Sequence, residues 1–178
     1  MSKKILILSG SPREEGNSDV LCEQFKQGAQ EAGHKVEKIF INDKKIHACV
    51  ACYACRGNGT CAFKDDMAEI LEKMVQADVI VLASPVYFYS INGQIKILID
   101  RTVARYTEIR NKELYYIITA ADTSIPMMQR SIECFRGFAD CLGGSQEKGI
   151  VYGVGAWNKG EIQKTKAMQE AFEMGRRA

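Results

Sequence analysis

Short, almost entirely apolar runs alternate along this chain with segments of helical periodicity. Residues 3–8, 78–83 and 113–119 are nearly continuously apolar, as strands buried on both faces of a sheet are. Residues 35–41 and 147–154 form two further β-rich runs. Because strands that alternate with helices pack best as a parallel sheet with right-handed crossovers, the pattern predicts an α/β fold.

The segments between these runs repeat apolar residues every three or four positions. The repeats predict helices around Leu21, Ile95 and Ile132, a further helix over residues 67–76, and a polar surface helix within residues 160–177. Five strands in one such domain favour a flavodoxin-like three-layer sandwich, whose five-stranded parallel sheet has the order 2-1-3-4-5.

Length and composition limit the possible classes of protein. The 178 residues, 46% of them hydrophobic, suit a single domain over residues 1–178, with a cysteine-rich loop insertion at residues 42–64. No apolar run approaches the roughly 20 residues of a transmembrane helix, and the net charge of +2 provides no basic field for nucleic acid. The chain opens without the features of a signal peptide, so we expect a cytoplasmic protein with neither a membrane nor a nucleic-acid partner.

The loop after the first strand, residues 9–18, is rich in small polar side chains and is called the first loop below. In an open parallel sheet, ligands bind beyond the carboxyl ends of the strands. This loop provides several donors and leads into a helix N-terminus, which attracts anions. It lacks the Walker and dinucleotide motifs and fits a terminal monophosphate, with an ordinary turn as the alternative. The candidate residues are Ser9, Ser11, Pro12, Arg13, Gly16, Asn17 and Ser18.

The loop after the third strand, residues 83–93, contains three successive aromatic residues at positions 87–89 and is called the aromatic loop. A flat ligand such as an isoalloxazine ring can lie against such a loop. The alternative is that these aromatic residues fill the core or a subunit interface.

Together the two loops resemble the NADPH-dependent FMN reductase family of flavodoxin-like proteins. The resemblance rests on Ser9-Gly-Ser-Pro-Arg, Gly16-Asn-Ser and Ser84-Pro-Val-Tyr-Phe, followed by Gly93-Gln-x-Lys and Asp100-Arg. It implies that the first loop holds the phosphate of FMN. It implies a homodimer or homotetramer with the flavin near the subunit interface. It also implies flavin-ring contacts at Pro85, Val86, Tyr87 and Phe88, and a weaker contact at Asp122 in the loop after the fourth strand.

Four of the seven cysteines lie in one segment, with the spacing Cys49-x₂-Cys52-x₂-Cys55-x₅-Cys61. Thiols stay reduced in the cytoplasm, so metal, redox or packing chemistry is expected rather than structural disulfides. Thiolates suit iron–sulfur clusters or zinc, and tight two-residue spacings favour a [4Fe–4S] cluster. A zinc site, a Cys52–Cys55 redox dithiol and cysteines retained without a cluster are the alternatives.

The cysteine spacing also resembles the motif of the iron–sulfur flavoproteins, a branch of the same family. The resemblance implies that Cys49, Cys52, Cys55 and Cys61 are the ligands of a [4Fe–4S] cluster that acts beside FMN.

These inferences predict an FMN-dependent electron-transfer oxidoreductase. Electrons would pass between a reduced donor and an acceptor, each a small molecule or a small protein, through FMN and the cluster. The flavin carries the chemistry, so no residue is assigned as catalytic. A cluster-free NAD(P)H-dependent FMN or quinone reductase is one alternative, and a non-catalytic electron carrier or redox sensor is another.

Overall fold

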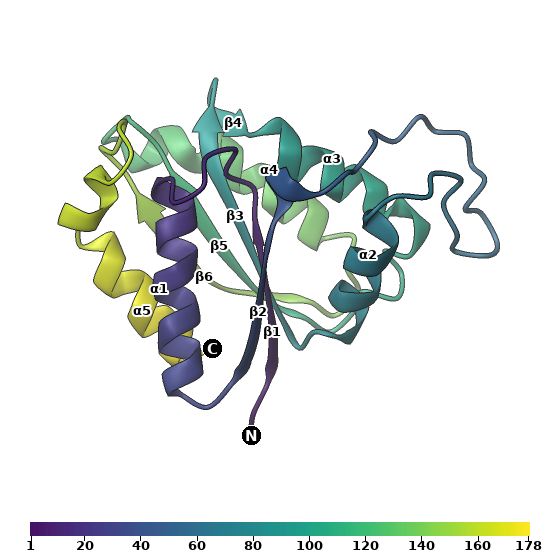
Figure 1. Ribbon diagram of the computed structural model, residues 1–178, viewed down its shortest axis with the longest axis horizontal. Coiled ribbons are helices and arrows are strands. Elements are labelled where there is room, and N and C mark those ends of the chain that lie inside the picture. Colours follow the sequence, from purple (N-terminus) through teal and green to yellow (C-terminus); the bar gives the residue numbers. More distant parts are fainter.

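A parallel sheet of five long strands forms the middle layer of the molecule, as the computed structural model of residues 1–178 shows (Figure 1). Its strands follow the order β2-β1-β3-β5-β6, which is the predicted 2-1-3-4-5 arrangement. The bounds are β1 (Lys4–Ser9), β2 (Lys35–Phe40), β3 (Val79–Tyr87), β5 (Glu113–Thr119) and β6 (Gln146–Gly153). The inner strands are almost entirely buried, which explains their continuous apolar sequences.

A sixth strand, β4 (Ser90–Ile91), corrects the prediction of a purely parallel five-stranded sheet. β3 continues to Tyr87, and the chain then reverses at Phe88 and Tyr89, whose φ angles are +49° and +61°. Ser90 and Ile91 consequently return antiparallel along the end of β3. Turns with two positive φ angles usually contain Asn-Gly or Asp-Gly, and this turn has neither, so no local signal predicted a hairpin here.

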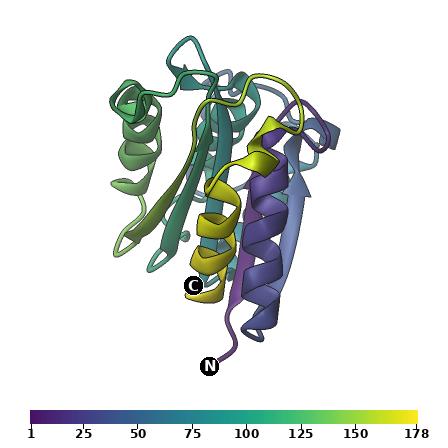
Figure 2. The ribbon, with the colours of Figure 1, turned by 90° about the vertical axis from the view of Figure 1, so that its left-hand side faces the viewer.

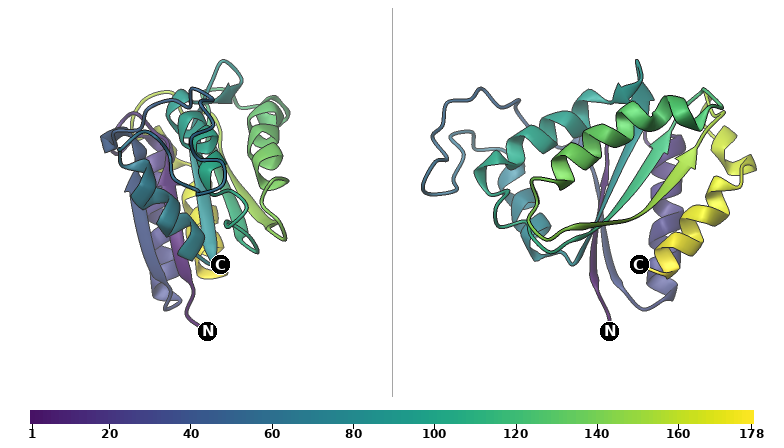
Figure 3. Two further views of the ribbon diagram at one scale, coloured as in Figure 1. Left: turned by 90° about the vertical axis from the view of Figure 1, so that its right-hand side faces the viewer. Right: turned by 180° about the vertical axis from the view of Figure 1, so that it is seen from behind.

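The helices cover the sheet on both faces. α1 and α5 lie side by side on one face (Figure 2), and α2, α3 and α4 cover the other (Figure 3). Their bounds are α1 (Asn17–Glu31), α2 (Met67–Gln76), α3 (Gly93–Arg101), α4 (Gln129–Ala139) and α5 (Ala167–Arg176), so each predicted helix is present. Four short 3-10 helices add to these, at Ile41–Asp43, Thr102–Ala104, Ile125–Met128 and Glu161–Lys164. None of these helices has the length and apolar character that crossing a membrane requires.

The segment between Asp43 and α2 contains no helix or strand and projects beyond α2 and α3 (Figures 1 and 3). It carries the four clustered cysteines, and we call residues 44–66 the cysteine loop. Loops of this length without regular structure are uncommon in compact domains and are usually functional.

Two glycines allow α1 and α5 to pack at unusually short distance. A Cβ atom on Gly28 would lie 2.0 Å from the carbonyl oxygen of Phe172, and one on Gly175 would lie 2.0 Å from that of Phe25. Both obstacles are backbone atoms, which cannot move without separating the helices. The contact therefore excludes any side chain at either position.

We expect Gly28→Ala to destabilise the protein by about 1–3 kcal/mol, because an added methyl group forces the two helices apart. Gly137→Ala is the matched control, since Gly137 is helical and nothing lies within 4 Å of its added Cβ. There alanine should leave stability unchanged or raise it by up to about 1 kcal/mol. Urea unfolding measures both values, and equal stability of the two variants would contradict the proposed packing.

Candidate functional site

A pocket of about 290 Å³ lies at the carboxyl edge of the sheet, between the loops that follow β1, β3, β5 and β6. The parallel strand directions bring these loops together although they are far apart in sequence. Seven of the residues predicted for cofactor binding line the pocket: Ser11, Arg13, Asn17, Ser18, Pro85, Val86 and Tyr87. The predicted first loop and aromatic loop thus form opposite parts of one site.

The first loop is held in shape by its own hydrogen bonds. The Ser11 hydroxyl donates to the carbonyl of Arg13 at 2.8 Å, and the Gly16 N–H donates to the same carbonyl at 2.9 Å. A Cβ on Gly16 would lie 2.7 Å from the Ser11 hydroxyl oxygen, so the tight turn needs glycine there. Arg13 itself is exposed at the rim of the pocket.

α1 begins directly after this loop, and no side chain caps its N-terminus. Gly16 is the N-cap residue and has no side chain that can accept the free N–H groups of the first turn. Uncapped N–H groups and the positive end of the helix dipole favour an anion at this position. Ser18, almost fully buried in the first turn, lines the same pocket.

Asp19 organises this region and was not predicted from the sequence. Its carboxylate accepts hydrogen bonds from the Ser9 hydroxyl at 2.9 Å, from the Glu15 N–H at 3.1 Å and from Lys38 at 2.9 Å. Burial alone would lower the pKa of Lys38, but hydrogen bonds to Asp19 and Glu23 outweigh it and raise that pKa. The lysine therefore stays charged and neutralises Asp19 beside the anion site.

Several predicted cofactor residues lie outside the pocket lining. The Ser9 hydroxyl is engaged by Asp19, and Asp122 accepts a hydrogen bond from the Ser124 N–H at 2.8 Å. Phe88, at the tip of the hairpin, is fully exposed to solvent. Pro12 and Gly16 belong to the first loop without facing the pocket. Contacts of these five residues with a cofactor stay predictions.

The loop after β6 contributes pocket residues that the sequence did not indicate. Asn17 ties it to α1, because its side-chain amide donates to the carbonyls of Ala156 at 3.1 Å and Asn158 at 3.0 Å. Ala156 and Trp157 line the pocket together with Thr119, Ala120 and Ala121 from the end of β5. Trp157 has 72% of its surface exposed, which is unusual for the only tryptophan of the chain.

Asn92, at the N-cap of α3, joins the aromatic loop to the first loop. Its backbone N–H donates to the Ser84 hydroxyl at 2.9 Å, and its side-chain amide donates to the Gly10 carbonyl. All three residues are buried. The two halves of the pocket are thereby fixed relative to each other.

These features suit FMN. The uncapped α1 N-terminus, the Ser11 and Ser18 hydroxyls and the Arg13 guanidinium match the needs of a terminal phosphate. Three of the lining residues are alanines, which occupy little space, and Tyr87 and Trp157 supply exposed aromatic surface. The pocket volume is close to the lower end of the range for small-molecule sites, about 300–1,000 Å³.

The four clustered cysteines line a second, larger pocket of about 560 Å³ between the cysteine loop and the end of α3. All of them are free thiols. However, no three His, Cys, Asp or Glu side chains of the chain are gathered closely enough to hold a metal ion. A soft-metal donor set is present in one cavity, and the loop would have to close further to bring the sulfur atoms together.

The three cysteines outside the cysteine loop differ in their burial. Cys22 is fully buried, and burial, with the nearby Asp19 charge, raises the pKa of its thiol far above the usual range. Cys134 is half-buried, and Cys141 is exposed just after the end of α4.

Comparisons with known proteins find similarity along most of the chain. The family model of NADPH-dependent FMN reductases matches residues 3–129. An iron-sulfur flavoprotein of Methanocaldococcus jannaschii is 42% identical over 99 residues, which are 56% of this chain and 51% of that protein. An iron-sulfur flavoprotein of Archaeoglobus fulgidus is 31% identical over 178 residues, covering 94% of this chain and 89% of that protein.

The fold also has counterparts among solved structures. An FMN-dependent NADH-azoreductase from Bacillus anthracis, in complex with FMN, aligns with a TM-score of 0.75 at 19% identity and covers 98% of each chain. The present chain spans about half the length of several curated relatives that it matches. With the family model covering most of the chain and a relative matched along nearly its whole length, the protein belongs to the NADPH-dependent FMN reductase family of flavin-dependent oxidoreductases.

Proposed function

We propose that this protein is an electron-transfer oxidoreductase that binds FMN in the pocket at the carboxyl edge of the sheet. The uncapped N-terminus of α1, which meets the hydroxyl and guanidinium donors of the first loop in one pocket, carries this proposal. The family membership and the FMN bound by the azoreductase of similar fold support it. FMN, when bound, supplies hydride and single-electron transfer.

Different residues of the pocket would bind different parts of FMN. Ser11, Ser18 and Arg13 would bind the phosphate, together with the free N–H groups of α1. Pro85, Val86 and Tyr87 would contact the ring from one side. Trp157 would cover part of it and reduce the access of water from the opposite loop.

We further propose that Cys49, Cys52, Cys55 and Cys61 hold a [4Fe–4S] cluster. The free thiols share one cavity, and the backbone between them bends sharply at Ala51 and Tyr53, with φ angles of +51° and +60°. Such conformations are unfavourable for residues other than glycine and are concentrated at functional sites. The names of the relatives, iron-sulfur flavoproteins, support the same assignment.

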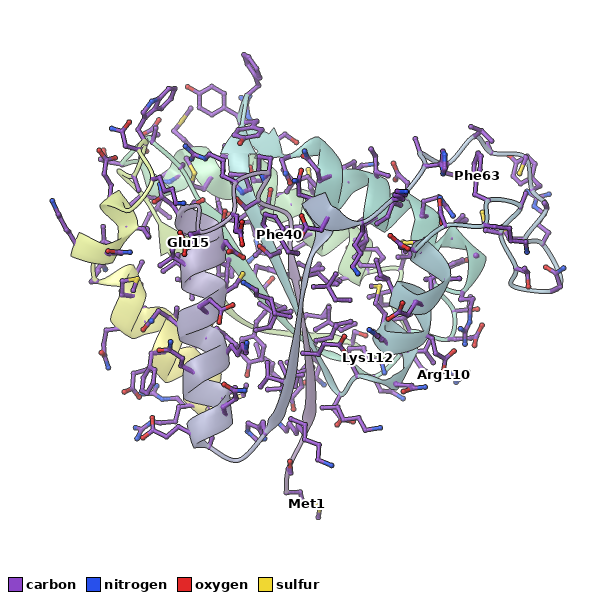
Figure 4. All side chains as sticks on the ribbon, viewed as in Figure 1. Met1, Glu15, Phe40, Phe63, Arg110 and Lys112 are labelled. Carbon is purple, nitrogen blue, oxygen red and sulfur yellow. The ribbon has the colours of Figure 1, made fainter.

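The position of the two pockets favours a homodimer or homotetramer. Glu15 of the first loop and Phe63 of the cysteine loop lie on opposite sides of the molecule (Figure 4). Efficient electron transfer between cluster and flavin would therefore use the flavin of a second copy, brought close by an interface. Four exposed aromatic residues provide apolar surface for such an interface: Tyr87 and Trp157, which line the pocket, and Phe88 and Tyr89, which follow Tyr87 in the hairpin turn. The electron donor and the acceptor would be small molecules or small proteins.

We expect Arg13→Gln to weaken FMN binding by about five- to tenfold, because a charge-assisted hydrogen bond to the phosphate is lost at an exposed site. Riboflavin, which has no phosphate, should bind the variant and the unchanged protein equally. Lys159→Gln is the control, because Lys159 pairs with Glu15 at the same loop but lies outside the pocket. Flavin fluorescence titrations measure the affinities. An equal loss for riboflavin would show that Arg13 does not bind the phosphate.

We expect Cys52→Ser to abolish iron binding while FMN binding is retained, since the two pockets share no residue. Anaerobically prepared unchanged protein should contain about four irons and four sulfides per chain. Cys141→Ser, at an exposed cysteine outside the loop, should keep both. A single zinc ion, or no metal in the unchanged protein, would refute the cluster and favour a zinc site or a cluster-free reductase.

A further inference from the structure

The two ends of the cysteine loop are joined at a narrow base. The Lys45 N–H donates to the Asp66 carboxylate at 2.8 Å, and the Asp66 N–H returns a bond to the Lys45 carbonyl at 3.1 Å. Two residues after Lys45, the His47 N–H donates to the Asp65 carboxylate at 3.0 Å. These bonds define what we call the neck of the loop, and all four cysteines lie beyond it.

Arg101, at the end of α3, binds both sides of this neck. Its guanidinium makes a two-pronged ion pair with Asp65, at 2.7 and 3.0 Å, and donates to the His47 carbonyl at 2.7 Å. Both charged side chains are only 2% exposed. One guanidinium therefore binds the chain on both sides of the cysteine segment.

Both carboxylate oxygens of Asp65 accept hydrogen bonds in this arrangement. Its second oxygen also accepts the Met67 N–H at 3.2 Å, at the start of α2. Asp66 is the N-cap residue of α2, but its carboxylate accepts the Lys45 N–H at the neck and does not cap the helix. Burial alone would raise the pKa of Asp65, but hydrogen bonds from Arg101 and His47 outweigh it and hold that pKa well below its usual range.

The Phe63 ring packs against both His47 and Arg101. It stacks on His47 at 4.9 Å between centroids, and the guanidinium carbon of Arg101 lies 5.3 Å from the ring centre. The aromatic surface shields the ion pair from water, which strengthens the electrostatic attraction.

One hydrogen-bond donor of the Arg101 guanidinium has no partner. The Nε–H of Arg101 is buried and makes no hydrogen bond, although Arg101 and Cys61 line the same cysteine pocket. A buried cationic donor without an acceptor is unfavourable, so a sulfur acceptor from the pocket would satisfy it.

We propose that Arg101 is a positioning residue for the cysteine loop: it fixes both ends of the loop through Asp65 and His47, and its Nε–H donates to the sulfur of Cys61 when the cluster is bound. The second part rests on the cluster of the proposed function. Hydrogen bonds to cluster sulfurs stabilise the more negative reduced form, so this bond would raise the reduction potential of the cluster.

The test compares Arg101→Gln and Arg101→Lys with Arg105→Gln. Arg105 is the matched control, because it lies near the same loop but makes its ion pairs with the exposed residues Glu72 and Glu108. Hydrogen exchange of the metal-free protein reports on the neck through the amides of Lys45, His47, Asp66 and Met67. We expect exchange at least about tenfold faster in Arg101→Gln, partial recovery in Arg101→Lys, and no change in Arg105→Gln. An unchanged FMN affinity shows that each variant is folded.

The reconstituted cluster provides the second readout. Both Arg101 variants should lose iron to a chelator at least about tenfold faster and have a more negative reduction potential, because lysine keeps the charge but lacks the Nε–H. Unchanged exchange at the neck amides would overturn the positioning role. An unchanged potential would overturn the bond to sulfur. Absence of iron from the unchanged protein would refute the cluster and that bond, while the exchange data would still decide whether Arg101 holds the loop.

Discussion

The parallel pairing of β1 with β3 is the constraint on which the pocket proposed for FMN depends. It places Ser9 beside Ala83, so that both chains leave the sheet at the same edge. The Gly10 N–H then donates to the Ala83 carbonyl at 2.9 Å, and a Cβ on Gly10 would lie 2.8 Å from that oxygen. The first loop and the aromatic loop separate only beyond this contact. Since the backbone polar groups at the edge bond to each other and to Asn92, the pocket walls are set before any ligand arrives.

Much of this architecture could be predicted because its signals are local. The helix over residues 67–76 and the strand over 113–119 have the predicted bounds, since apolar periodicity and composition change sharply at their ends. The first loop was identified from the concentration of donors ahead of a helix. The β4 hairpin was missed because its turn residues, Phe88 and Tyr89, have none of the local chemistry that normally permits positive φ angles.

The unpredicted parts of the site depend on contacts between distant residues. Asp19 looked like an ordinary residue of a first helical turn, and its importance comes from Lys38, which approaches from the neighbouring strand. Trp157 enters the pocket only because Asn17 binds the loop after β6 across 139 residues of sequence. Arg101 was noted only as part of a family motif, and its partners at the neck come from both sides of the cysteine segment. Contacts between side chains that are far apart in the sequence produce no periodic pattern, so they cannot be predicted from it.

The long-range bonds of Asn17 also have a consequence for the order in which the protein forms during synthesis. The partners of the neck are all present once residue 101 has left the ribosome, whereas the pocket proposed for FMN is complete only after Ala156 and Asn158 have been made. Domains are translated from the N-terminus at about 5–20 residues per second, so the cysteine loop has several seconds in which it can close before the flavin can be enclosed. The nascent chain would therefore complete its cysteine loop before the pocket at the carboxyl edge of the sheet.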